Sequence, residues 1–191
     1  MNSSLRLAVT GLLLGAGVSC TEYTPKPRGL YRIDIPEAHY REFAADGLPC
    51  TFRVSRLVTV ELPPPGAPAG WINLSYGTLN ASIYCSYCEI TPETLPAVTE
   101  ECRTLLLRSV KEATAITEQS YEDREIPLYA TLFRIAGESA SPIQFTLTDS
   151  VRRFFRGALY YQCRMDADSL APVTGYVGKD VVELIQSFQW K

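Results

Sequence analysis

IQFTLTDSVRRFFRGALYYQC, residues 143–163, contains two runs rich in apolar and β-branched residues, one on each side of Asp149-Ser150. Such runs are typical of β-strands, and Asp and Ser favour turns because their side chains hydrogen-bond to nearby backbone. We therefore predict strands over Ile143–Thr148 and Arg156–Cys163, separated by a turn.

Helical periodicity is present on both sides of these strands. After Thr94, which we expect to cap a helix with Pro96 in its first turn, apolar residues recur at steps of three and four to about Thr117. A shorter helix is predicted over about Lys179–Phe188. The two apolar stripes are Val98, Cys102, Leu105, Leu106, Val110 and Ala113 in the first helix, and Val181, Leu184, Ile185 and Phe188 in the second.

The remaining segments add strands without strict alternation of strand and helix. Pro36 followed by Glu37 predicts a short helix, and residues 63–70, with four prolines and two glycines, predict a loop. Because strands are grouped around one long helix and followed by a terminal helix, the predicted fold class is α+β with a mostly antiparallel sheet. Further strands are predicted over Thr51–Leu62, Trp71–Tyr76, Asn80–Glu89 and Pro127–Ile135.

Composition indicates a folded domain and excludes some classes of function. With 191 residues, 46% of them hydrophobic and 20% charged, the chain is long and apolar enough to bury a core. The net charge of −3 argues against a general nucleic-acid-binding protein, whose binding surface is usually basic. We therefore expect no nucleic-acid partner.

The N-terminus has the pattern of an export signal. Leu7–Val18 is an apolar run of 12 residues, about 18 Å as a helix, which is too short for a bilayer core of about 30 Å. The small residues before Cys20 resemble a bacterial lipoprotein box, in which the cysteine is acylated, and the alternative is an ordinary signal peptide. We therefore predict a signal peptide over 1–19, an acylated Cys20 and tether over 20–29, and a single globular domain over 30–191.

The sequence contains no recognisable catalytic motif. The nucleophile-elbow, zinc-protease, phosphate-loop and dinucleotide-binding patterns are absent, and His39 is the only histidine. Cys85 and Cys88 form a CxxC pair, but positions i and i+3 of a strand face opposite sides, whereas a redox pair opens a helix. Structural zinc would need two more ligands, and the other cysteines lack paired spacing. We therefore expect no catalytic residue, no metal site and no cofactor, and interpret these thiols as buried or as partners in a long-range disulfide.

Polar side chains gather in and near the predicted hairpin, and two interpretations of them stay open. In the first, Asp149 and Ser150 hydrogen-bond to turn backbone, while Arg156 pairs with Asp149 or Asp168. In the second, they form one exposed polar patch that docks a partner. The candidate residues are Gln144, Asp149, Ser150, Arg153, Arg156, Asp168 and Ser169.

Four segments resemble a known family. They are YTPKPRGLYRIDIP at Tyr23–Pro36, SASPIQFTLTDSVRRFFRGALY at Ser139–Tyr160, DSLAP at Asp168–Pro172 and SFQWK at Ser187–Lys191. With these segments the chain resembles the gliding motility lipoprotein GldD family of Bacteroidetes-type bacteria. It departs from the family pattern around residues 80–90, where the CxxC pair lies.

The resemblance implies an outer-membrane lipoprotein that is accessory to gliding motility and to the type IX secretion machinery, without a known catalytic activity. It also implies protein partners in the envelope. Independently of the resemblance, Thr21 stands where an inner-membrane retention aspartate would, and no acidic export run follows Cys20, so we expect the lipid anchor to hold the domain on the periplasmic face of the outer membrane. The predicted order of elements is similar to the PsbP-like α/β/α sandwich. Two alternatives stay open: a periplasmic small-ligand module, with Asp149, Arg153 and Arg156 lining an anion pocket, and a hydrolase.

Overall fold

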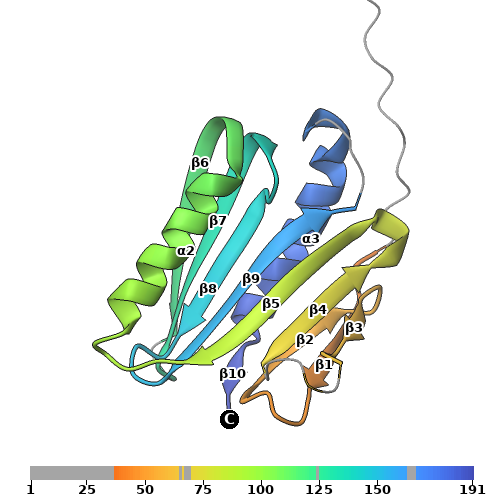
Figure 1. Cartoon of the computed structure of the whole chain (residues 1–191). Helices are drawn as coiled ribbons and strands as arrows, with labels where there is room; N and C mark the ends of the chain where they lie inside the picture. The colour runs from red at the N-terminus through yellow and green to blue at the C-terminus, as the bar shows by residue number, and fades with distance from the viewer. Residues whose placement is uncertain (1–36, 65, 67–69, 124, 163–166) are drawn as a thin grey trace, which may run out of the picture. The chain divides into compact units, whose positions relative to one another are not determined.

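The computed structural model describes residues 37–64, 66, 70–123, 125–162 and 167–191, and it has the predicted α+β fold class with antiparallel sheets (Figure 1). One sheet has seven strands in the order β3-β4-β5-β9-β8-β7-β6, and the other has three in the order β1-β2-β10. The strands are β1 (Tyr40–Ala44), β2 (Cys50–Ser55), β3 (Thr59–Glu61), β4 (Trp71–Tyr76), β5 (Ala81–Glu89), β6 (Val110–Asp123), β7 (Leu128–Ser139), β8 (Ile143–Thr148), β9 (Arg153–Tyr161) and β10 (Gln189–Trp190). The helices are α2 (Leu95–Ser109), α3 (Ala167–Gln186) and the 3-10 turn η1 (Gly77–Leu79).

The hydrophobic core lies between the large sheet on one side and α3 with the small sheet on the other. Alternate residues of β8 point into it, so that Ile143, Phe145 and Leu147 are buried while the residues between them are partly exposed. On the neighbouring strand β9, Gly157 leaves room for the Phe145 ring, because a Cβ at position 157 would lie 2.3 Å from Phe145 Cζ. The central strands therefore pack an aromatic ring where a side chain would otherwise stand.

Aromatic rings connect the small sheet to this core. The Phe52 ring of β2 stacks on Phe188 with ring centroids 5.8 Å apart, and Phe155 of β9 lies 5.5 Å from the same Phe188 ring. Trp190 of β10 packs edge-on against Phe188 at 4.7 Å. The C-terminal residues thus join the two sheets through one aromatic cluster.

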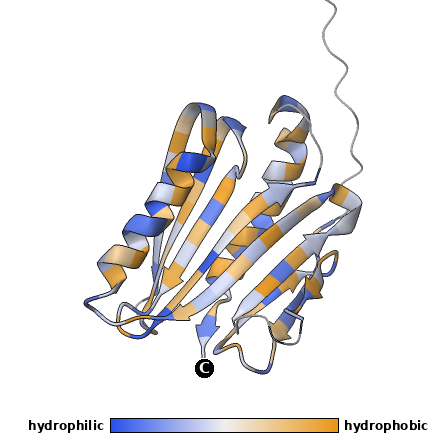
Figure 2. Ribbon diagram, in the orientation of Figure 1, coloured by the Kyte–Doolittle hydropathy of each residue, from blue (hydrophilic) through white to orange (hydrophobic). Residues whose placement is uncertain are grey.

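Helix α2 lies on the opposite face of the large sheet. Of its residues only Leu106 and Ser109 are buried, and hydrophilic and hydrophobic residues alternate along it in Figure 2. The Ser109 Oγ accepts a hydrogen bond of 2.9 Å from Gln144 Nε2 on β8. Residues on the sheet face beneath α2 are therefore the ones that position this helix.

Several predicted elements are confirmed. The strands at Trp71–Tyr76 and Ile143–Thr148 have the predicted bounds, and Asp149-Ser150 forms the turn between β8 and β9. β5, β7 and β9 cover most of the strands predicted at Asn80–Glu89, Pro127–Ile135 and Arg156–Cys163. Position 163 lies outside the described residues.

Two predicted helices are wrong in part. The middle helix ends at Ser109, not near Thr117, because the chain from Val110 onward pairs with β7 as strand β6. The terminal helix begins no later than Ala167, well before the predicted Lys179, and Pro172 lies inside it. Buried residues such as Val173 and Val177 pack this first half of the helix against the core. Pro172, Gly175 and Gly178 lower the helix propensity of this segment, and tertiary packing overrides it.

Other predicted elements near the beginning of the domain also differ. The described part of the expected helix at Pro36-Glu37 is not helical, and Tyr40–Ala44 pairs with β2 as strand β1. The predicted strand Thr51–Leu62 is two strands in different sheets, since the backbone turns where Val58 N–H bonds to the Ser55 carbonyl at 3.0 Å.

Candidate functional site

The turn between β8 and β9 is built around the Asp149 carboxylate. Its Oδ1 accepts backbone N–H hydrogen bonds from Val151, Arg152 and Arg153 at 2.9, 2.7 and 2.9 Å. Partial burial opposes ionisation, but these three hydrogen bonds outweigh it and lower the pKa of Asp149. Asp149 therefore shapes the turn, and its carboxylate is already occupied by backbone donors.

Side chains next to Asp149 are also held within the turn. Ser150 adopts the left-handed region at φ 62°, and its N–H bonds to Thr148 Oγ1 at 2.9 Å. Arg153 Nη1 lies 4.0 Å from Asp149 Oδ2, and its guanidinium lies 5.8 Å from the centre of the Trp190 ring. In contrast, Val151 at the tip is 54% exposed and Arg152 is exposed. The turn is thus held by its own hydrogen bonds and leaves Val151 and Arg152 exposed.

Gln144 and Arg156 lie together on the sheet face below α2. Arg156 Nη1 donates to Cys102 Sγ of α2 at 3.8 Å, and Gln144 bonds to Ser109 as described above. The cavity that both side chains line is only about 20 Å³ in volume. These two residues therefore attach α2 to the sheet and leave too little room for a ligand.

Asp168 and Ser169 belong to the first turn of α3, at the opposite end of the large sheet from the β8–β9 turn. Asp168 lines an open cavity of about 980 Å³, whose other walls are β7 and the residues that follow it, including Glu138. The structure thus places the seven candidate residues in three places: the β8–β9 turn, the contact below α2 and the beginning of α3. The ion pair of Asp149 is with Arg153, whereas Arg156 contacts Cys102.

The CxxC pair has the geometry that a strand predicts. Cys85 of β5 is 4% exposed in the core, whereas Cys88 is exposed on the other face of the sheet. Burial raises the pKa of Cys85 far above the ordinary thiol value, which keeps it protonated. Among the described cysteines, Cys50, Cys85, Cys88 and Cys102 are free thiols.

A buried polar cluster that was not predicted from the sequence surrounds Asp180 of α3. This carboxylate is 4% exposed and accepts hydrogen bonds from Tyr40 Oη on β1 at 2.9 Å and from Tyr76 Oη on β4 at 3.1 Å. Burial raises the pKa of Asp180, although the two tyrosine hydrogen bonds favour its charged form. A signal was present in the sequence, because Asp180 stands three residues after Val177 and four before Leu184, within the buried stripe.

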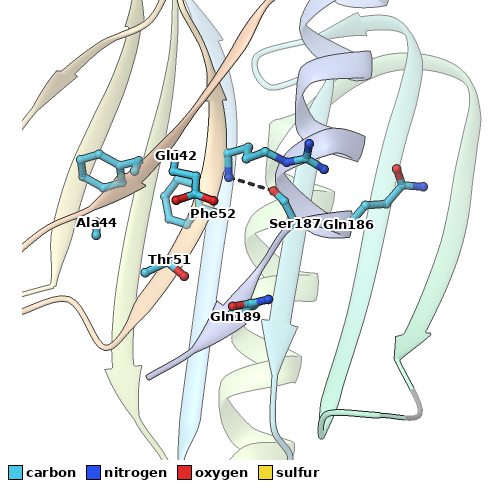
Figure 3. A pocket seen from close by; sticks show the side chains of 9 residues that line it. Glu42, Ala44, Thr51, Phe52, Gln186, Ser187 and Gln189 are labelled. Carbon is cyan, nitrogen blue, oxygen red and sulfur yellow. Dashed lines mark hydrogen bonds between the residues drawn. The ribbon is translucent and has the colours of Figure 1, made fainter.

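A cavity of about 350 Å³ lies on the outer side of the small sheet (Figure 3). Its polar side chains come from β1, β2 and the end of α3, and include Glu42, Thr51 and Gln186. The Arg53 backbone N–H donates to Ser187 Oγ at 2.8 Å, and its guanidinium lies 2.7 Å from Glu183 Oε1. Arg53, one of the two charged residues that line this cavity, is thus already paired with Glu183.

The described residues hold neither a membrane-spanning helix nor a metal-binding cluster. No helix there is long and apolar enough to cross a membrane. No group of three or more His, Cys, Asp or Glu side chains is placed to hold a metal ion in this part of the chain.

Comparison with known families gives a clear match. The profile of the gliding motility lipoprotein GldD family matches residues 20–190, nearly the whole chain, and begins at Cys20. The chain belongs to this family. Membership in the GldD family identifies it as a membrane-anchored lipoprotein of gliding motility.

Comparison with curated proteins and solved structures gives no further indication of function. No curated protein matches the chain. Among solved structures, the solution structure of cyanobacterial PsbP (CyanoP) from Synechocystis sp. PCC 6803 is similar over 86% of this chain and 99% of that chain, with 10% identity and a TM-score of 0.46. A likeness at this level carries no argument about function.

Proposed function

We propose that this GldD family member is an outer-membrane lipoprotein, anchored through acylated Cys20 with its domain on the periplasmic face. It acts without catalysis, as an accessory factor of gliding motility and type IX secretion, through protein partners in the envelope. The observation that carries the proposal is the family match, whose first residue is the cysteine expected to be acylated. The signal peptide, Cys20 and the tether lie outside the described residues.

Surface geometry around the β8–β9 turn supports a protein partner over a small anion. An anion pocket would need Arg153 and Arg156 to face one cavity, but Arg153 lies between Asp149 and Trp190, whereas Arg156 lies beneath α2. At the tip, Val151 and Arg152 are both exposed, so an apolar side chain stands next to a basic one. Such a pair suits contact with a protein, where arginine is enriched among residues that dominate binding.

The anchor is tested by Cys20→Ala, with Cys88→Ala as a matched control that removes an exposed cysteine elsewhere. We expect Cys20→Ala to leave the membrane fraction after a carbonate wash and to fail to restore colony spreading and type IX secretion in a deletion strain. The Cys88→Ala protein should remain in the membrane and restore both. Retention of Cys20→Ala in the washed membrane would contradict the lipid anchor.

Restoration of spreading by the soluble variant at normal abundance would show that membrane anchoring is not required for function. Wild-type spreading and secretion in the deletion strain would contradict the accessory role itself. The two parts of the proposal are therefore tested separately.

A further inference from the structure

Strand β6 forms one edge of the large sheet and is 14 residues long. It pairs with β7 alone among the strands that the structure describes, and its register is regular from Ala115, opposite Ala136, to Asp123, opposite Leu128. Every residue from Glu112 to Ser120 is exposed, including Ile116 at 44%. One side of β6 therefore presents a long row of backbone N–H and C=O groups without a strand partner.

The other edge of the same sheet is built differently. β3 spans only Thr59–Glu61, so this edge is of the short kind that folded proteins use to avoid pairing with other chains. β6 extends for about 45 Å, and the bulges that interrupt it lie near its beginning, before Ala115. The regular part of β6 is thus the longer and less protected edge of the two.

Charge along β6 indicates which kind of chain would pair with it. The strand has Lys111 at its beginning and four carboxylates, which are Glu112, Glu118, Glu122 and Asp123. Glu112 lies opposite Glu138 of β7, which lines the cavity of about 980 Å³ beside the beginning of α3, and Asp168 lines it too. Thr114 of β6 lines the same cavity, so Glu138 and Asp168 add negative charge near the beginning of the strand. Arg134 of β7 is a cation beside β6, and its Nη1 donates to Gln119 Oε1 at 3.1 Å.

A second copy of this chain is a poor occupant of this edge. Pairing two β6 strands would bring four carboxylates from each copy along a single seam, and like charges across a strand pair are destabilising. A segment rich in Lys or Arg would instead place opposite charges beside them, while its backbone completes the ladder.

We infer that β6 is a docking edge at which an extended, basic segment of a partner protein pairs as an additional strand. The inference deepens the proposed function and rests on it, since it names the surface and the chemistry of a protein partner. Main-chain hydrogen bonds supply the attachment, and Glu118, Glu122 and Asp123 select a basic segment over an acidic one.

The test uses the lipidated full chain in detergent and two probes, the peptides acetyl-KTVTKTVTK-amide and acetyl-ETVTETVTE-amide. Amide hydrogen exchange is measured strand by strand with each peptide. We expect the basic peptide to slow exchange in β6 and not in β3, which is the internal control, and the acidic peptide to leave both unchanged.

A charge-reversal variant sharpens the result. Glu118→Lys combined with Glu122→Lys should weaken binding of the basic peptide roughly three- to tenfold, since exposed ion pairs are individually weak. The matched control reverses two exposed charges outside β6, Glu93→Lys just before α2 and Glu100→Lys within it, and should leave the affinity within a factor of two. Unchanged exchange in the β8 amides of both variants confirms that they fold.

Three outcomes would overturn the inference: no slowing of β6 exchange with either peptide, equal slowing with both, or concentration-dependent self-association that slows β6 exchange without peptide. Each of these leaves the Cys20 anchor and the secretion phenotype untouched, because those are measured in cells. Failure of the docking edge is therefore distinguishable from failure of the proposed function.

Discussion

Helices α2 and α3 both have apolar stripes in sequence, yet they are attached to the sheet in different ways. Eight residues of α3 are buried, against two of α2. α3 contacts both the large sheet, through β7 and β8, and β2 of the small sheet. The other residues of α2 are exposed or half-buried, and Figure 2 colours several of them hydrophilic. Helical periodicity therefore predicts a helix but does not predict how much of that helix is buried.

The largest expected difference between the helices comes from removing one leucine from each. Leu184 of α3 is 2% exposed, and Leu184→Ala should cost about 2–5 kcal/mol of unfolding free energy, because it leaves a cavity in the core. Leu107 of α2 is 58% exposed, and Leu107→Ala should change stability by less than about 0.5 kcal/mol. Urea unfolding measures both, and equal effects would show that α2 is as deeply packed as α3.

A second prediction concerns the buried carboxylate of α3. Asp180→Ala leaves the hydroxyl groups of Tyr40 and Tyr76 without their acceptor and should cost about 1–3 kcal/mol. Tyr40→Phe, which removes one donor from a partly exposed position, should cost less. A neutral or stabilising Asp180→Ala, measured by urea unfolding, would mean that desolvation of the carboxylate outweighs its hydrogen bonds.

The same carboxylate should make stability depend on pH. Because the pKa of Asp180 is raised in the folded state, the folded protein binds this proton more tightly than the unfolded chain does. The stability that Asp180 contributes is therefore greatest below its unfolded pKa of about 3.9 and is lost as pH rises through the folded pKa. The melting temperature of wild type relative to Asp180→Asn should thus fall from pH 4 upward, and a constant difference would contradict the raised pKa.

The smallest expected effect is on α2. Arg156→Ala removes the contact with Cys102 and should lower stability by less than about 1 kcal/mol while speeding hydrogen exchange in α2. Arg152→Ala, at the exposed tip of the β8–β9 turn, is the control and should leave α2 exchange unchanged. If Arg156→Ala destabilises the protein as much as Leu184→Ala, then α2 belongs to the same cooperative core as α3.

The sequence predicted the parts of the fold that depend on near neighbours. The β8–β9 hairpin follows from two apolar runs and the Asp149-Ser150 turn signal, and the opposite placement of Cys85 and Cys88 follows from the period of a strand. The GldD resemblance also came from short segments, and it is confirmed over residues 20–190. The hairpin and the placement of the two thiols each depend on a stretch of about 25 residues or fewer, and the family resemblance depends on several short segments along the chain.

The grouping of the candidate residues could not be predicted in the same way. Gln144 and Arg156 lie on neighbouring strands and meet α2, whereas Asp168 lies at the other end of the sheet from Asp149. The sequence places all of them within 26 residues of one another, but strand direction and helix position separate them. Their assignment to one docking patch stays a prediction that only binding measurements test.

By itself, the sequence determined the fold class, the hairpin at Asp149, the strand that separates the two thiols and the family. Only the tertiary structure decided that the chain leaves α2 at Ser109 to form β6, and that Asp180 is buried with Tyr40, which is 140 residues away. The physical reason is that helix and strand periods arise from neighbouring residues, whereas strand pairing and burial depend on which distant segments meet. In the first half of α3, the helix propensity of the local sequence and the packing against distant segments disagree. Packing prevails there, because the helix buries apolar side chains in the core.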